Sequence, residues 1–504
     1  MKPRTRFFFV LVLTIAGFFA FFWFVTSPSM VAQDLSVTNT VFVSPLAPFR
    51  SPLATPTDRR VVSDDTKWLF AHDVVDNPHE AMRSTADGFA PPWNRTSDFM
   101  IGRVVVGIIL PESNGAVMPS TEDWTSGEIS FVTQEINQAL QWWTQQASNR
   151  GISLEFVIPS DHPITVATGY EPIKIIGLEE PFGEAHIWVN DTMAHLGYND
   201  PGQNYLQRVQ HYDDDLRRTH HADWAFTIFV VNGTNDGDGA FAPGSWGIPN
   251  AVVMAWAKRP GPYTVVNNLS SIGANWPNKF YLDNIIAHEI GHVFGAADEV
   301  WADGSDCGTG SECTAKFGYL SVENQNCDRT PQCAIDRPDC VMRVGNLVYL
   351  CSYSAGQVGW RDSDSDGLPD PVDTVPQLTV TGYPSSPSPS YILNYSAEIT
   401  DIPYPTTQSG YVPVSINTVS VQYRIGATGS WVTAIPGDGA WDSSYEENFR
   451  IAIFDNGTYT IYLRAINRVG HTSAVTSHTI TINSSEPVYR VRLPLVLQNY
   501  STSN

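Results

Sequence analysis

The spacing of apolar residues divides the chain into a region of mixed helices and strands and a later region of strands only. In the first region, apolar runs predict buried strands, and apolar residues three or four positions apart predict amphipathic helices. Thr125 and Glu128 form a capping box at the start of one such helix. The expected elements are, in order, a strand at Val104–Leu110, this helix to about residue 149, a strand at Ser153–Ile158, a weak strand at His186–Val189, a helix at 203–219, strands at Trp224–Val231 and Ala251–Trp256, and a helix at 279–294.

Residues 376–485 contain short runs in which apolar and polar residues alternate, a pattern typical of half-buried strands. Asp455-Asn456-Gly457 predicts a hairpin turn between two of them. The number and spacing of the runs predict an immunoglobulin-like or fibronectin type III-like sandwich. The fold class we expect is therefore α+β, with helices and a mixed sheet, followed by an all-β sandwich. The expected sandwich strands are Tyr391–Ile399, Val419–Ile425, Phe449–Phe454, Tyr459–Ile466 and Val475–Ile482.

The motif H-E-x-x-H-x-x-G-x-x-D runs from His288 to Asp298. Residues four apart share one face of a helix, so His288 and His292 can bind a single metal ion. Glu289 lies beside them, where a carboxylate can act on water at the metal rather than bind it. Gly295 can end the helix in a left-handed conformation and return Asp298 to the ion. Three protein ligands with a fourth position open are typical of catalytic rather than structural zinc.

This motif resembles that of the metzincin clan of zinc peptidases, and its terminal Asp resembles the snapalysin-type variant. The resemblance implies a metzincin-like peptidase domain at 100–361 with a methionine turn beneath the metal. Met342 is the residue that matches, with an ordinary core methionine as the alternative. The resemblance also implies that the strand Asn250–Trp256 pairs with an extended substrate, and an ordinary internal strand is the alternative. No residue convincingly matches the tyrosine that follows the methionine in some metzincins.

A second motif, at residues 362–373, has acidic side chains at positions 1, 3, 5, 9 and 12 and Gly at position 6, as calcium loops do. Pro369 and Pro371 exclude the exiting helix of an EF-hand. The loop therefore resembles a thrombospondin type 3 or dockerin-like loop, and a merely acidic linker is the alternative. At 362–375, calcium would stiffen the joint between two domains. The expected ligands are Asp362, Asp364, Asp366, the backbone carbonyl of Leu368, Asp370 and Asp373.

The N-terminus predicts export. Basic residues precede an uncharged apolar run, Phe7–Val25, and small residues follow it. The run is long enough to span a bilayer, so residues 1–32 are either a cleaved signal peptide or an N-terminal anchor. Both alternatives place the remaining chain outside the cytoplasm, secreted or on the extracytoplasmic face of the membrane. Residues 33–99 are expected to be a Pro/Ser-rich spacer or a pro-segment, although 67–99 could also begin the catalytic domain, and the tail 486–504 has no assigned role.

All cysteines of the chain lie between residues 307 and 351. An even number of clustered cysteines in an exported chain predicts disulfides, here three with fifteen possible pairings. A second zinc site is the alternative, but no C-x-x-C pair is present. The cysteines concerned are Cys307, Cys313, Cys327, Cys333, Cys340 and Cys351.

The charge balance restricts the partners. The chain has 29 Lys and Arg against 52 Asp and Glu, a formal net charge of −23. This argues against nucleic acid and against an anionic membrane surface, so contact with a membrane is expected only through an uncleaved N-terminal segment. The oligomeric state stays open.

Together these features predict an exported zinc-dependent endopeptidase that acts on proteins or peptides, with catalytic Zn²⁺ and structural Ca²⁺. The alternative is a non-catalytic surface adhesin or carbohydrate-binding protein with a vestigial zinc site. The motif alone also allows hydrolysis of a bond other than a peptide bond.

Overall fold

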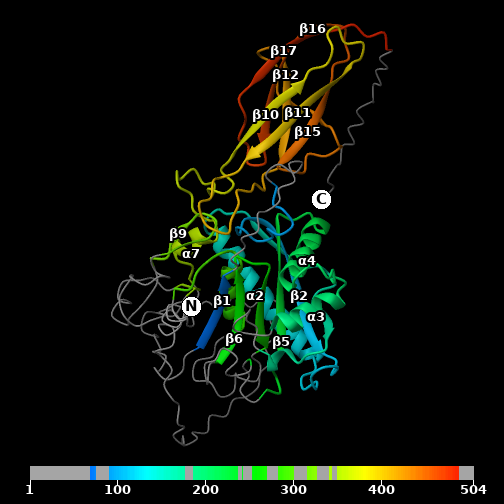
Figure 1. Ribbon diagram of the computed structural model, residues 1–504. Coiled ribbons are helices and arrows are strands. Elements are labelled where there is room, and N and C mark those ends of the chain that lie inside the picture. Colours follow the sequence, from blue (N-terminus) through cyan, green and yellow to red (C-terminus); the bar gives the residue numbers. More distant parts are fainter. Residues whose placement is uncertain are drawn as a thin grey trace, which may run out of the picture. The chain divides into compact units, whose positions relative to one another are not determined.

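The structure is a computed structural model that describes residues 68–74, 90–175, 185–236, 241, 252–268, 282–299, 315–325, 340–342 and 349–486. The chain divides into two compact units (Figure 1). Among the described residues, the first unit contains 68–74, those between 91 and 373, and 404–413, and the second contains 90, 374–403 and 414–486. Segment 404–413 lies within the range predicted for the sandwich, but it packs with the first unit.

The first unit is built on a seven-stranded mixed sheet. Its strands β7, β5, β2, β3 and β4 are joined by parallel pairings, whereas β6 runs antiparallel to β7 and parallel to β1. The order is β1 (Trp68–Val74), β6 (Val252–Arg259), β7 (Tyr263–Asn268), β5 (Trp224–Asn232), β2 (Gly102–Ser113) and β3 (Leu154–Val157), and β4 (Ile164–Thr168) also pairs with β2.

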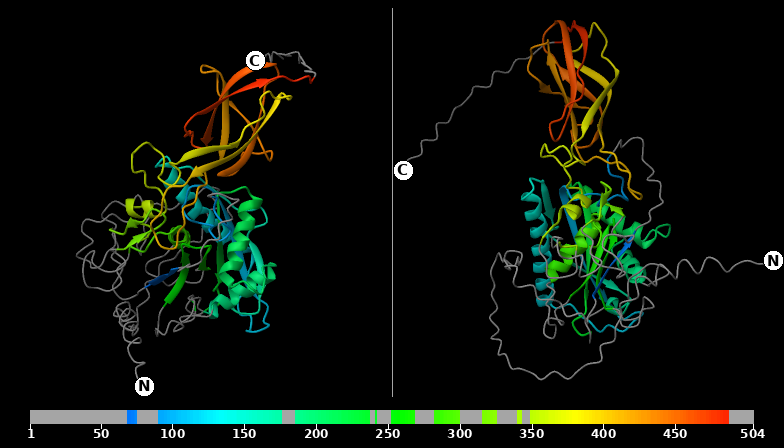
Figure 2. Two further views of the ribbon diagram at one scale, coloured as in Figure 1. Left: turned by 45° about the horizontal axis from the view of Figure 1, so that its top comes forward. Right: turned by 90° about the vertical axis from the view of Figure 1, so that its left-hand side faces the viewer.

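Helices cover both faces of this sheet (Figure 2). The ring of Phe226 in β5 packs edge-on against Phe294, just after α5, with 5.7 Å between centroids. On the opposite face, a Cβ added to Gly107 in β2 would lie 3.0 Å from the ring of Tyr212 in α4. Helices α2 (Ser126–Ser148) and α5 (Leu282–Val293) thus share one face, and α3 (Ala185–His195) and α4 (Tyr205–Thr219) share the other. Smaller elements are a 3₁₀ turn at Pro172–Lys174, β8 (Lys316–Phe317), β9 (Val322–Glu323) and α7 (Ser352–Gln357).

The predicted capping box begins α2. The Thr125 hydroxyl accepts a hydrogen bond from the Glu128 amide at 3.3 Å, and the Glu128 carboxylate accepts one from the Thr125 amide at 2.9 Å. Such a cap stabilises a helix by about 1 kcal/mol. The apolar positions that predicted the helix, including Val132, Ile136 and Trp143, are buried. This prediction is confirmed.

The weak strand expected at His186–Val189 is wrong, because these residues lie in α3. Val189 and Met193, four positions apart, are both buried in the core against the sheet. A four-residue apolar run fits either a strand or one turn of a buried helix, so periodicity could not decide. Strands β4 and β7 were not predicted at all.

The strand expected to accept substrate is not an open edge. Strand β1 pairs with it in parallel, from Trp68 opposite Val252 to Val74 opposite Arg259, and β7 pairs with its other side. In this structure β6 has neighbouring strands on both sides, so the prediction that it pairs with a substrate is wrong. Its alternative, an ordinary internal strand, is confirmed. Residues 67–99 were predicted to be either a pro-segment or the beginning of the catalytic domain. The pairing of β1 with β6 favours the second alternative, because β1 belongs to the sheet of the first unit.

The second unit consists of two four-stranded antiparallel sheets. They share a core to which both contribute, for example Leu393 and Ile399 from one sheet and Val421 and Leu463 from the other. The α+β class followed by an all-β sandwich is thereby confirmed at the level of architecture. One sheet has the order β10 (Val375–Gly382), β11 (Ile392–Ile402), β15 (Tyr445–Ala452) and β14 (Ile435–Pro436), and the other β13 (Val432–Thr433), β12 (Val419–Ile425), β16 (Gly457–Asn467) and β17 (Thr476–Ile482).

The hairpin predicted at Asp455-Asn456-Gly457 is wrong. Strand β15 belongs to one sheet and β16 to the other, so this turn passes between sheets. The Asn456 side chain binds the backbone of Ser484 through both its amide nitrogen and its oxygen. Turn residues allow the chain to reverse, but the packing of the shared core decides which strands pair.

No helix within the described ranges is long and apolar enough to cross a membrane. The export segment 1–32, residues 33–67 and residues 487–504 lie outside these ranges, so the predictions made for them stay predictions.

Candidate metal centre

Helix α5 carries the H-E-x-x-H part of the motif and is held in place by buried apolar side chains and by a hydrogen bond from α2. Its apolar residues Ile285, Ile286 and Ile290 are buried. The indole nitrogen of Trp143, in α2, donates to the carbonyl of Ala287 at 2.9 Å. These contacts fix the rotation of the helix, and with it the direction of the two histidines.

Gly295 ends α5 as the sequence predicts. Its φ is +89°, in the left-handed region that favours glycine. The Gly295 amide donates to His292 O at 2.8 Å and the Ala296 amide to Gly291 O at 2.9 Å, the paired bonds of a Schellman motif. A Cβ at this position would also lie 2.9 Å from the Cα of Gly318. The turn reverses the chain directly before Asp298.

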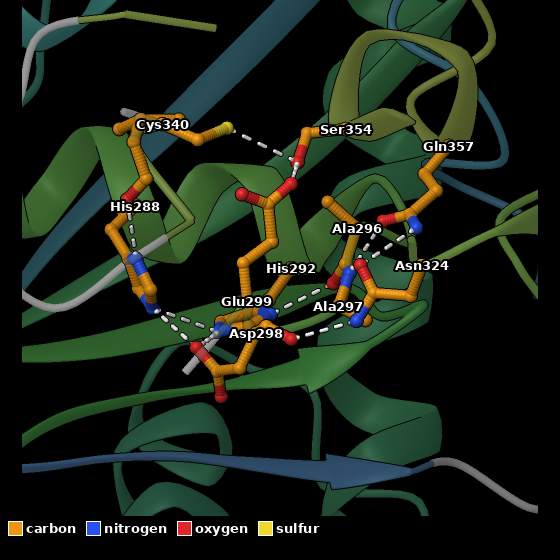
Figure 3. A network of polar contacts seen from close by, with 11 residues as sticks. His288, His292, Ala296, Ala297, Asp298, Glu299, Asn324, Cys340, Ser354 and Gln357 are labelled. Atoms are coloured by element: carbon orange, nitrogen blue, oxygen red, sulfur yellow. Dashed lines mark hydrogen bonds and ion pairs between the residues drawn. The ribbon is translucent and has the colours of Figure 1, made fainter. Parts of the chain in front are cut away.

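The three predicted ligands converge on one point (Figure 3). The Nε2 atoms of His288 and His292 lie 3.1 Å apart. Oδ1 of Asp298 lies 3.0 Å from the first of these nitrogens and 3.4 Å from the second. A tetrahedral zinc ion with bonds of about 2.0–2.1 Å holds its ligand atoms roughly 3.3 Å apart. The triangle therefore fits Zn²⁺ without rearrangement of the side chains.

The other ring nitrogen of each histidine is fixed by a backbone carbonyl. Nδ1 of His288 donates to Val341 O at 2.7 Å, and Nδ1 of His292 donates to Ala296 O at 2.8 Å. A neutral imidazole with its proton on Nδ1 leaves the lone pair on Nε2 for a metal. Both histidines are thus set in the tautomer that a metal ligand requires.

The segment that carries Asp298 is held by two amide side chains. Nδ2 of Asn324 donates to the Asp298 carbonyl at 2.8 Å, and Oε1 of Gln357 accepts from the Ala297 amide at 2.9 Å. The two amides also contact each other, at 3.3 Å. No sequence motif marks Asn324 or Gln357, so these positioning residues could not be predicted from the sequence. The carbonyl of Ala296, by contrast, lies inside the motif.

Glu289 is fully buried, and neither of its carboxylate oxygens has a hydrogen-bond partner among the described residues. Burial raises the pKa of Glu289 well above its usual range, against the opposing charge of His288. A buried carboxyl group without partners is costly to the fold. It is the arrangement expected of a group whose partner is water or substrate at a reaction centre.

Burial and the neighbouring carboxyl groups act in opposite directions on the pKa of His288 when no ion is bound. Burial alone would lower the pKa of His288, but the hydrogen bond and charge of Asp298, together with the charge of Glu289, raise this pKa to about 9. The carboxyl groups of Asp298 and Glu289 and the two imidazoles thus line a buried site that is suited to a divalent cation.

Met342, the expected turn methionine, is fully buried beneath α5. A Cβ added to Gly291 would lie 2.4 Å from its sulfur, so the thioether packs directly on the glycine between the two histidines. The residue lies in a turn, and its carbonyl accepts from the Glu299 amide at 2.8 Å. A soft thioether fills this irregular space without being a ligand.

The cysteine predictions are only partly covered by the described residues. Cys340 and Cys351 are buried and carry no disulfide in the structure. Cys307, Cys313, Cys327 and Cys333 lie outside the described residues. The three disulfides therefore stay a prediction.

The acidic loop brings part of its predicted ligand set together. Asp362, Asp364 and Asp366 each offer a carboxylate oxygen within 4.8 Å of the others, and an oxygen of Asp373 lies within 4.8 Å of Asp366. Amides of the loop, including that of Gly367 at 2.9 Å, donate to Asp362 and lower the pKa of its carboxyl group.

Asp370 does not join this group. Its carboxylate pairs with Arg361 at 2.8 Å and accepts the amide and hydroxyl of Ser363, both at 2.8 Å. The Asp370 carboxylate at position 9 of the loop thus forms an ion pair with Arg361, and the prediction that Asp370 binds calcium stays a prediction. The carbonyl of Leu368 stays a predicted ligand.

Comparison with known proteins gives no relative from which function could be transferred. The chain matches no protein-family model and no curated protein. Solved structures that share some local similarity include the sulfane dehydrogenase SoxCD of Paracoccus pantotrophus, a mutant of the SrpA adhesin of Streptococcus sanguinis, and the PKD domain of the human receptor SorCS2.

These similarities are slight. Identity is 16%, 17% and 13% over 19%, 22% and 24% of this chain, with TM-scores of 0.14, 0.13 and 0.14. The chain spans 23% of the dehydrogenase, 59% of the adhesin and 82% of the PKD domain. At such TM-scores they carry no inference about fold or function.

Proposed function

We propose that this chain is an exported zinc-dependent endopeptidase with a metzincin-like catalytic domain. The proposal is carried by two features together: the spacing of the atoms of His288, His292 and Asp298 fits zinc, and the carboxyl group of Glu289 has no hydrogen-bond partner among the described residues. The reaction is hydrolysis of a peptide bond by water. Proteins or peptides are the proposed substrates.

In this proposal His288, His292 and Asp298 hold the zinc. The carbonyls that fix the two Nδ1 protons keep the ligand nitrogens aimed at one point. Zinc, when bound, supplies a Lewis acid that polarises the peptide carbonyl and lowers the pKa of a water molecule. Asp298 adds a negative charge where the third ligand is usually neutral, which strengthens binding and weakens the Lewis acid.

Glu289 performs the proton transfers. Because no described residue hydrogen-bonds to it, its carboxylate is available to take a proton from the attacking water. The same carboxyl group then delivers that proton to the leaving amine. Burial raises the pKa of this carboxyl group above its usual range, and such a raised pKa is typical of carboxyl groups that both accept and donate a proton during catalysis.

The same carboxyl group argues against the alternative, a surface adhesin with a vestigial zinc site. A site that only binds metal gains nothing from a buried, unpartnered Glu289, and replacement by an apolar residue would stabilise it. Burial of this carboxyl group costs free energy, and the group lies where the hydrolysis of a peptide bond would use it.

Removal of zinc is expected to abolish cleavage. The purified exported protein is incubated with an unstructured protein substrate, then with a zinc-selective chelator, and finally with added Zn²⁺. We expect cleavage before chelation, none after it, and recovery on adding about one equivalent of zinc. A calcium-selective chelator serves as the control and should leave initial cleavage unchanged. Cleavage that survives complete loss of zinc would refute the proposal.

For the acidic loop we propose a calcium site formed by Asp362, Asp364, Asp366 and Asp373, with the carbonyl of Leu368. The close approach of the carboxylates supports it, since a cation would relieve their repulsion. Bound Ca²⁺ would stiffen residues 362–375.

Calcium is expected to bind this loop and to protect it from proteolysis. The Asp364→Asn substitution removes one charged ligand and should weaken calcium binding by about ten-fold. The control is Asp438→Asn, which changes an exposed carboxylate of the sandwich. The readouts are calorimetric titration and the rate of cleavage within 360–375. Equal affinities in the two variants, or no protection in the wild type, would contradict a calcium site here.

A further inference from the structure

Two buried thiols lie beside the metal centre without belonging to it. Cys340 is fully buried and Cys351 is 5% exposed. One atom each from these sulfurs and from the Glu299 carboxylate lies within 4.8 Å of the others. In Figure 3, dashed lines join Ser354 both to the Cys340 sulfur and to the Glu299 carboxylate.

The contacts among these groups place both sulfurs around the same small space. The Cys351 amide donates to the Cys340 sulfur at 3.2 Å. The Cys340 thiol donates to the Ser354 hydroxyl at 3.4 Å, and the Cys351 thiol donates to the Glu299 carboxylate at 2.7 Å. The hydroxyl of Ser354 donates to the same carboxylate, also at 2.7 Å, so Glu299 keeps this partner if the thiol proton is lost.

We propose that Cys340 and Cys351 are joined by a disulfide in the exported protein, and that this bond braces the metal centre. The proposal selects one pair from the fifteen possible pairings. It rests on the export that is part of the proposed function, because disulfides persist in oxidising compartments.

The bond forms by exchange with an oxidised disulfide partner, such as a protein disulfide oxidant or oxidised glutathione. One thiolate attacks a sulfur of that partner and releases a thiol; the second protein thiolate then displaces the remaining thiol. The protein loses two protons and two electrons, which reduce the partner. Burial raises the pKa of the Cys340 thiol in the folded chain, so we expect exchange to occur before the site closes.

The position of the pair explains why a bond there would support the ligands. Cys340 directly precedes Val341, whose carbonyl orients His288. Cys351 is the N-cap of α7, whose Gln357 holds the backbone before Asp298. A disulfide would join the segment that contains Val341 to the start of α7. The groups that position His288 and Asp298 would then be covalently linked to each other.

A second metal site formed by Glu299, Cys340 and Cys351 is the rival interpretation. The local contacts favour the disulfide over it. Glu299 already accepts hydrogen bonds from both Cys351 and Ser354. A metal would need Cys340 as a thiolate, which its burial opposes.

Peptide mapping of the native protein tests the pairing. Free thiols are alkylated without reduction, the protein is digested, and linked peptides are identified by mass spectrometry. We expect one fragment that joins Cys340 to Cys351. Alkylation of both residues, before or only after metal removal, would overturn the pairing, as would a bond from either one to another cysteine. The experiment does not depend on peptidase activity, so its outcome is separate from that of the proposed function.

The brace is tested by the zinc affinity of the double variant Cys340→Ser/Cys351→Ser. Loss of groups that orient metal ligands weakens binding by roughly 10- to 100-fold, and we expect at least the lower value. The control is Ser352→Ala, an exposed substitution in the same helix, which should leave the affinity unchanged. Competition with a zinc indicator gives the affinity without any catalytic step. Equal affinities in wild type, control and double variant would contradict the brace.

Discussion

Replacement of Glu289 by Gln is expected to lower the rate of peptide cleavage by about 10³-fold while zinc stays bound, because the general base is lost. Gln has nearly the same shape but cannot accept a proton. The three ligand side chains are unchanged, so one zinc per chain should remain. Since Glu289 is buried and has no hydrogen-bond partner in the described part of the chain, the substitution should not lower the thermal midpoint of unfolding.

The measurement compares cleavage rates of wild type and Glu289→Gln at equal bound zinc, with the metal content determined for both. Glu289→Asp is the matched control, because it keeps the carboxylate but shortens the side chain by one methylene; we expect partial activity. If Glu289→Gln cleaved as fast as wild type with zinc bound, Glu289 would have no part in proton transfer.

Replacement of Asp298 by Ala is expected to weaken zinc binding by about 10³-fold. Loss of a residue that only orients a ligand weakens binding by roughly 10- to 100-fold, and loss of a ligand itself should cost more. Asp298 supplies the third corner of the triangle and its only negative charge. Two neutral imidazoles alone hold zinc weakly. The measurement is competition with a zinc indicator, and cleavage should be lost at zinc concentrations that saturate the wild type.

Asp298→His is the control for this change, because it restores a third ligand without the charge. We expect this variant to bind zinc and to act as a stronger Lewis acid, so the acidic limb of its pH–rate profile should move to lower pH. An unchanged pH profile and turnover would contradict the role assigned to the charge. Unchanged zinc affinity in Asp298→Ala would remove Asp298 from the ligand set.

The convergence of the three candidate ligands could be predicted from the sequence because the geometry of this motif is local. The four-residue repeat of a helix sets the distance between His288 and His292, and the left-handed turn at Gly295 sets the return of Asp298. None of these relations needs knowledge of distant segments. The packing of Met342 on Gly291 is longer in range and was suggested only by the family resemblance.

The groups that orient the ligands could not be predicted, because they come from distant segments through backbone atoms or single amides. Val341, Asn324 and Gln357 lie 53, 26 and 60 positions from the residues they bind. A backbone carbonyl leaves no signal in the sequence. The pairing of β1 with β6 could not be predicted either, because it depends on which strands the folded sheet brings together.

Hydrolysis of peptide bonds by water activated at the zinc site is tested by mass spectrometry of an unstructured protein after incubation with the zinc-loaded wild type in ¹⁸O-labelled water. We expect new peptide fragments that carry the heavy oxygen on their new carboxyl termini, with free amines on their partner fragments. An intact substrate with zinc fully bound, or cleavage at a bond other than a peptide bond, would contradict the proposed hydrolysis.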